Sequence, residues 1–135
     1  MLGMKNYTRE YIDGCRSRVD SDLVAYRNLV AADKTHLDSD FEPVFFNTMV
    51  LLLDHFFVHR LRTIEGKNGN PLNEVRVMCE SILNHNNRMT ADKSIKLSPA
   101  NSVLKVKFGD EIKLTGADFL LIYKAFFAEI ESKYL

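Results

Sequence analysis

Two histidines and a run of charged residues between positions 55 and 76 are the side chains best suited to chemistry. His55 and His59 are four residues apart, so on a helix both project from one face, as in zinc and di-metal sites. A third ligand would come from Glu80, His85 or His36. HExxH and paired Glu-x-x-His motifs are missing, so the alternative is a pair of hydrogen-bonded histidines in the core or an interface.

The charged run that follows has two possible roles. Its acids and bases nearly balance, which favours an ion-pair network in which Arg60 or Arg62 pairs with Glu65 or Glu74. Alternatively, an arginine left over from these pairs joins backbone amides at the next helix start to bind a phosphate or carboxylate. Gly66 and Gly69 would let the backbone approach that ligand. The candidate ligand-binding residues are Arg60, Arg62, Asn70, Glu74 and Arg76.

Four helices must position these side chains. Apolar residues recur every three or four positions over residues 8–32, 41–65, 70–85 and 116–134. Good capping residues precede all four segments: Thr8, Ser39 or Asp40 before Phe41, Asn70 before Pro71, and Thr115 with Asp118. Gly14 weakens the first helix and would permit close packing there.

The second predicted helix has almost no polar face in its middle. Such a helix is surrounded by other elements, so we expect it to form the centre of the fold. Its apolar side chains at the centre should be nearly fully buried, namely Phe45, Met49, Leu52, Leu53 and Phe56.

The residue period changes to two between the third and fourth helices. Residues 94–97, 103–108 and 111–114 all have the alternation of short extended segments. A three-residue loop at 109–111 would keep the apolar residues of the last two segments on one face. We therefore predict an all-α, four-helix bundle-like domain spanning residues 1–135, with one small antiparallel β-hairpin before the last helix.

The charge composition excludes some classes of binding partner for this domain. The 135 residues include 18 basic and 18 acidic side chains, so the formal net charge is zero. This balance argues against a surface devoted to nucleic acid or anionic lipid, and it removes a barrier to self-association. We expect a homodimer, with no nucleic acid and no membrane as partner.

Cysteine spacing and hydropathy predict the compartment. Cys15 and Cys79 fit neither a disulfide framework nor a zinc spacing, so we interpret them as core residues in a reducing compartment. The N-terminal residues lack the apolar run of a signal peptide. The apolar helix at 44–58 is too short to span a bilayer and contains Asp54 and His55. The expected location is the cytoplasm.

One further indication comes from three sequence segments. The segment HRLRTIEGKNGNPLNEVR, with FEPVFFN before it and GDEIKLT after it, resembles a small, uncharacterised helical protein family of bacterial, actinobacterial type. The resemblance covers most of the chain from Phe41 on. It implies no activity, cofactor or catalytic residue.

These observations favour a non-enzymatic binding or interaction module that forms a homodimer. Its expected ligand is a polar or anionic small molecule, and no cofactor is expected. The alternative is a small-molecule or metal-dependent enzyme with its site between the second and third predicted helices.

Overall fold

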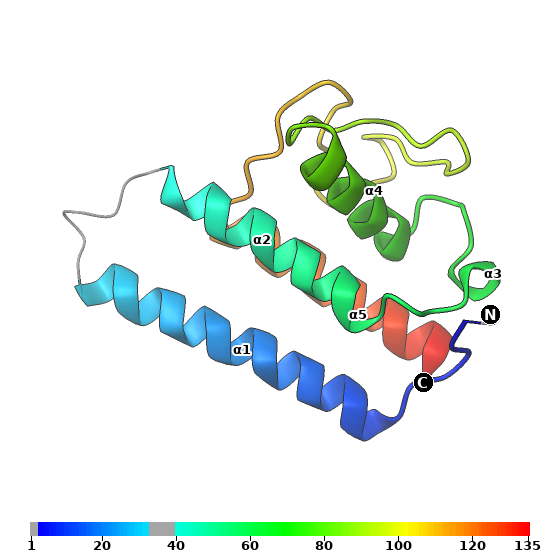
Figure 1. Cartoon of the computed structure of the whole chain (residues 1–135), viewed down its shortest axis with the longest axis horizontal. Helices are drawn as coiled ribbons and strands as arrows, with labels where there is room; N and C mark the ends of the chain where they lie inside the picture. The colour runs from blue at the N-terminus through cyan, green and yellow to red at the C-terminus, as the bar shows by residue number, and fades with distance from the viewer. Residues whose placement is uncertain (1–2, 33–39) are drawn as a thin grey trace.

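The computed structural model describes residues 3–32 and 40–135 and contains five helices in that part of the chain. They are α1 (Arg9–Ala32), α2 (Phe41–Phe56), α3 (Arg62–Glu65), α4 (Pro71–Asn84) and α5 (Gly116–Tyr134). Helices α2 and α5 contact each other and run in the same direction, with α1 along one side and α4 on the other (Figure 1). The prediction of an all-α fold is confirmed.

Local capping sets three of the helix starts where the sequence predicts them. At the start of α2 the side chain of Asp40 makes no capping hydrogen bond, and Ser39 lies outside the described residues. The Thr8 hydroxyl accepts from the backbone N–H of Tyr11, and Asn70 accepts from two backbone N–H groups in the first turn of α4. Thr115 and Asp118 form a reciprocal capping box at the start of α5. Each side chain satisfies backbone donors that the helix leaves without partners.

The core is rich in aromatic residues. Phe57 is fully buried and meets Phe126 and Phe127 at centroid distances of 5.9 and 5.7 Å. Both cysteines are buried and free, as expected.

The predicted burial of the second helix is correct only in part. Met49 and Leu53 are 5% and 0% exposed, but Phe45, Leu52 and Phe56 are half-buried. Phe56 lines an open groove beside α1, so this part of α2 is not covered on all sides.

The second helix ends nine residues earlier than predicted, at Phe56 rather than at residue 65. The N-terminal segment is the physical reason. Met4 donates to the carbonyl of His59 and accepts from the N–H of Leu61, so the backbone here pairs with a distant segment. Arg60 also folds back and donates to the carbonyl of Phe57, which satisfies a carbonyl beyond the helix end. The chain then resumes as the single turn α3.

The predicted β-hairpin is wrong, because the described residues form isolated bridges and no strand. The N–H groups of Val103 and Leu104 donate to the Glu74 carboxylate instead of to a neighbouring strand. Lys105 then takes a φ of 58°, which breaks an extended run. Residues 109–112 pair with residues 87–89.

The alternation that suggested a strand nevertheless predicts burial correctly at residues 112–114, although Phe108 is 40% exposed. Ile112 and Leu114 are 1% and 2% exposed, whereas Lys113 between them is exposed. Asn47 of α2 fixes this segment, because its side chain donates to the Ile112 carbonyl and accepts from the Leu114 N–H. A buried amide side chain thus takes the role that the sequence suggests for a partner strand.

Candidate anion-binding site

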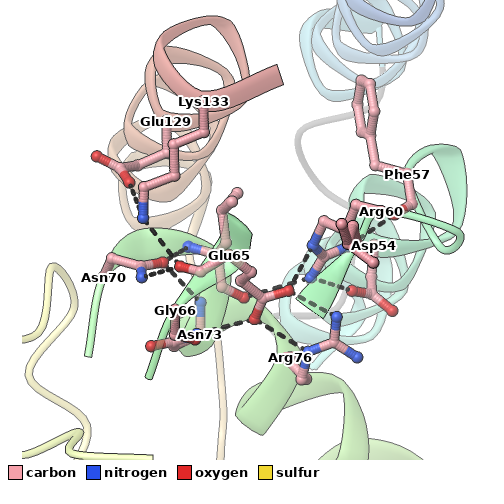
Figure 2. A network of polar contacts seen from close by, with 12 residues as sticks. Asp54, Phe57, Arg60, Glu65, Gly66, Asn70, Asn73, Arg76, Glu129 and Lys133 are labelled. Atoms are coloured by element: carbon pink, nitrogen blue, oxygen red, sulfur yellow. Dashed lines mark hydrogen bonds and ion pairs between the residues drawn. The ribbon is translucent and has the colours of Figure 1, made fainter. Parts of the chain in front are cut away.

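A buried carboxylate organises the corner between α3 and α4. Glu65 is 0% exposed and accepts hydrogen bonds from Arg60 Nε at 2.8 Å and Asn73 Nδ2 at 2.8 Å. Arg76 donates to both of its oxygens, from Nε at 3.0 Å and Nη2 at 2.6 Å (Figure 2). We call Arg60, Glu65, Asn73 and Arg76 the Glu65 network. It ties the end of α3 to the first turns of α4.

The pKa of Glu65 reflects this arrangement. Burial acts to raise the pKa, but the Arg76 hydrogen bonds, the charge of Arg60 and the Asn73 hydrogen bond lower it further than burial raises it. The result is a pKa below the ordinary value of 4.5. Glu65 is therefore ionised at neutral pH and holds both guanidinium groups in fixed positions.

Arg60 is committed to the interior. Its side chain is 0% exposed, and besides Glu65 it donates to Asp54 Oδ1 at 3.0 Å and to the Phe57 carbonyl at 3.0 Å. Its guanidinium also lies over the Phe126 ring, 5.7 Å from the centroid. These partners occupy all three guanidinium nitrogens of the buried Arg60 side chain, which makes Arg60 a structural residue.

Arg62 and Arg76 have donors left for a ligand. The Arg76 side chain is 23% exposed, and its Nη1 group makes no hydrogen bond within the described residues. Arg62 is exposed, and its side chain likewise makes no hydrogen bond or ion pair in residues 3–32 and 40–135, although its charge helps to lower the pKa of Asp92. Both line a hollow of about 400 Å³, which we call the arginine hollow; its lining is Gly3, Val58, His59, Arg60, Leu61, Arg62, Thr63 and Arg76.

A second depression, the polar cleft, adjoins the arginine hollow because Arg62 and Arg76 line both. It encloses about 550 Å³, and its other lining residues are Asp54, Val77, Cys79, Glu80, Leu83, His85, Thr90, Ala91, Asp92 and Lys93. Its lining contains acids as well as bases, whereas the lining of the arginine hollow contains bases and no acid among the described residues. The two depressions therefore offer different electrostatic environments.

The other predicted ligand-binding residues lie elsewhere. Asn70 caps α4 and donates to the carbonyl of Glu65 at 2.7 Å, so it supports the corner without lining either depression. Glu74 is 1% exposed and accepts from Val103 N at 2.7 Å and Leu104 N at 2.9 Å. The predicted ion pair of Arg60 or Arg62 with Glu65 or Glu74 is confirmed as the pair Arg60–Glu65, and the described residues form no ion pair with Glu74.

The glycine-rich loop contacts the chain itself. A Cβ at Gly69 would lie 2.5 Å from the carbonyl oxygen of Lys96 and 2.7 Å from the Asn101 side chain. The backbone of Lys96 also donates to the carbonyl of Lys67 at 2.8 Å. The sequence suggested that a ligand approaches the backbone at these glycines. At Gly69, residues 96–101 of the chain itself occupy that space.

The two histidines predicted as metal ligands lie beside α1, and one of them also reaches the arginine hollow. His55 and His59 are both exposed and both line the groove beside α1, while His59 also lines the arginine hollow. Glu80 and His85 line the polar cleft instead, and the remaining candidate, His36, lies outside the described residues. In the described part of the chain, no group of three His, Cys, Asp or Glu side chains could hold a metal ion.

Sequence reasoning missed the contribution of α5. Lys133 donates to the carbonyl of Glu65 at 2.9 Å, and the Tyr134 hydroxyl donates to the carbonyl of Leu61 at 2.8 Å (Figure 2 shows Lys133). Both residues belong to the last turn of α5, about seventy positions further along the chain. No spacing in the sequence connects them to α3.

Comparison with protein-family models, with curated proteins and with solved structures finds no match to this chain. The resemblance to a bacterial helical family therefore stays a prediction. Among the described helices, none is both long enough and apolar enough to cross a membrane.

Proposed function

We propose that this protein is a non-enzymatic binding module and that its arginine hollow takes the anionic group of a small polar molecule. The supporting observation is that Arg62 and Arg76 keep free donors at one hollow while Glu65 holds Arg76 in place. A guanidinium group presents planar donors that match carboxylate and phosphate oxygens.

Fixed geometry is what distinguishes Arg76 from an ordinary surface arginine. Two hydrogen bonds to Glu65 and a half-buried stem restrict its rotamers before any ligand arrives. Binding then loses less side-chain freedom than it would at a flexible arginine. Arg62 is exposed and supplies a second positive charge that adapts to the ligand.

The polar cleft suits the remainder of the ligand. Its acids Glu80 and Asp92 accept hydrogen bonds or face a positive group, and Lys93 adds a donor. The ligand class is therefore a small molecule with one carboxylate or phosphate and a polar body.

Calorimetric titration with inorganic phosphate and with acetate tests this proposal. We expect Arg62→Gln to weaken binding of the better anion roughly tenfold to a hundredfold, because hydrogen bonds to charged groups are lost. Arg27→Gln is the matched control, since Arg27 is an exposed arginine of α1 that does not line the hollow. If the wild type binds neither anion, or Arg62→Gln and Arg27→Gln bind equally well, the proposal fails.

We also propose that the module is a homodimer in the cytoplasm. The large apolar side chains of α1 that remain exposed support self-association, including Val24 at 52% and Leu29 at 47%. The two free, buried cysteines support a reducing compartment.

A further inference from the structure

Gly14 occupies a position on α1 for which the chain itself gives no reason. A Cβ placed there would have no neighbour within 4 Å among the described residues, so no intramolecular packing requires glycine. Glycine in the interior of a helix is less favourable than alanine. The close packing predicted at Gly14 is therefore not made by the described residues of the same chain.

Gly14 lines a wide depression, the α1 groove, which measures about 940 Å³. The groove separates the first turns of α1 from the end of α2 and the N-terminal segment; its lining is Met4, Asn6, Tyr7, Thr8, Glu10, Tyr11, Gly14, Cys15, Arg18, His55, Phe56, Val58 and His59. Met4, Tyr11 and Val58 are 47%, 43% and 46% exposed. Exposed apolar side chains thus line the same groove as the glycine.

The charges on this face would complement those on the same face of a second copy. Glu10 and Arg18 lie four residues before and four residues after Gly14, so the three form one ridge along α1. All three line the α1 groove. If two copies of α1 cross antiparallel at Gly14, Glu10 of each copy faces Arg18 of the other, twice by symmetry.

We propose that Gly14 is the crossing point of a two-fold dimer in which α1 packs against α1 of a second copy. The missing side chain lets the two backbones approach, and Tyr11 of each copy covers apolar surface of the other. This inference rests on the proposed homodimer and names its surface. It is independent of anion binding at the arginine hollow.

Glu10 and Arg18 do not form an ion pair with each other within one chain. Eight residues of helix separate them by about 12 Å along the axis, which is too far for an ion pair. Arg18 instead lies 3.5 Å from Asp22 and its side chain is 64% exposed. The guanidinium is therefore accessible to a second copy.

Sedimentation velocity at micromolar concentration tests the surface. We expect the wild type to sediment as a species of about 31 kDa, twice 15.5 kDa. Gly14→Trp should be monomeric, and its helical circular dichroism should be retained because the position is open. Ala128→Trp is the matched control, since Ala128 is exposed on α5 away from the groove and should stay dimeric.

Charge reversal tests the pairing itself. Glu10→Arg or Arg18→Glu alone should raise the dissociation constant roughly tenfold or more, because each places like charges opposite each other twice. The double variant Glu10→Arg/Arg18→Glu should restore wild-type association. A mixture of the two single variants should also form a heterodimer, because one chain then carries two positive and the other two negative groups on this ridge.

The outcomes separate this surface from the proposals on which it rests. A wild type that is monomeric throughout overturns both the homodimer and this surface, while the phosphate titration still tests the hollow. A dimeric wild type that tolerates Gly14→Trp and both charge reversals overturns this surface alone. Restoration by the double variant establishes the antiparallel contact.

Discussion

Two buried glutamates, nine positions apart, show how differently the same side chain is used in this molecule. Glu65 is 0% exposed and bonds to two arginines and an asparagine, whereas Glu74 is 1% exposed and bonds to the backbone N–H groups of Val103 and Leu104. The pKa of Glu65 is lowered. Burial raises the pKa of Glu74, and the two backbone N–H groups with the charge of Lys105 do not offset this effect.

The difference shows which carboxylate supports the candidate site. Glu65 neutralises buried positive charge and fixes Arg76 at the arginine hollow. Glu74 fixes the long connection between α4 and α5, where it replaces the hydrogen bonds that a strand partner would supply. Burial alone therefore does not identify a functional carboxylate, because its partners decide both its charge and its role.

The largest expected effect is that of Glu65→Gln. The substitution leaves the buried Arg60 and the half-buried Arg76 without their shared counter-charge. We expect a loss of about 3–5 kcal/mol in the free energy of unfolding, measured by urea denaturation. Glu111→Gln removes an exposed carboxylate paired with Lys113 and should change stability by less than about 1 kcal/mol. Equal losses in both variants would contradict the central role of Glu65.

Glu74→Gln should have a smaller effect at neutral pH. Glutamine keeps one oxygen acceptor for a backbone N–H, and the variant no longer buries a charge that lacks a directly paired cation. We expect a loss of about 1 kcal/mol by the same denaturation measurement. A loss as large as that of Glu65→Gln would remove the distinction between the two glutamates.

The two variants should also differ in the sign of their pH dependence. Because the pKa of Glu74 is raised above 4.5, its ionisation favours the unfolded state, so its contribution falls as pH rises through the raised pKa. Because the pKa of Glu65 is lowered below 4.5, its contribution is present above 4.5 and is lost as pH falls through the lowered pKa. Urea denaturation of the wild type and of each variant, measured over pH values on both sides of 4.5, gives the loss of unfolding free energy caused by each substitution. That loss should grow with pH for Glu65→Gln and shrink with pH for Glu74→Gln.

Helix starts could be predicted from the sequence because their causes are local. The Thr115 and Asp118 side chains meet across one turn, and so do Asn70 and the first N–H groups of α4. The end of α2 and the path of residues 103–114 could not be predicted in this way. Met4, near the N-terminus, pairs with His59 and Leu61. Glu74 accepts from Val103 and Leu104, which follow it in the sequence by 29 and 30 positions.

The candidate site was predictable to a similar extent. The short connection between α3 and α4 brings Arg62 and Arg76 to one corner, as their spacing around the loop indicates. Which arginine would be fully paired could not be predicted. Asp54 accepts from Arg60 only because α2 ends early, and Lys133 arrives from the opposite end of the chain.

The most direct test of the arginine hollow is nuclear magnetic resonance of the guanidinium Nη–H signals during titration with inorganic phosphate, because Nη1 is the donor that Arg76 has free. Arg60 provides an internal reference, because Glu65, Asp54 and the Phe57 carbonyl occupy its donors. The account predicts saturable shifts for Arg62 and Arg76 and no shift for Arg60. Saturable shifts confined to other arginines, or none at all, would contradict it.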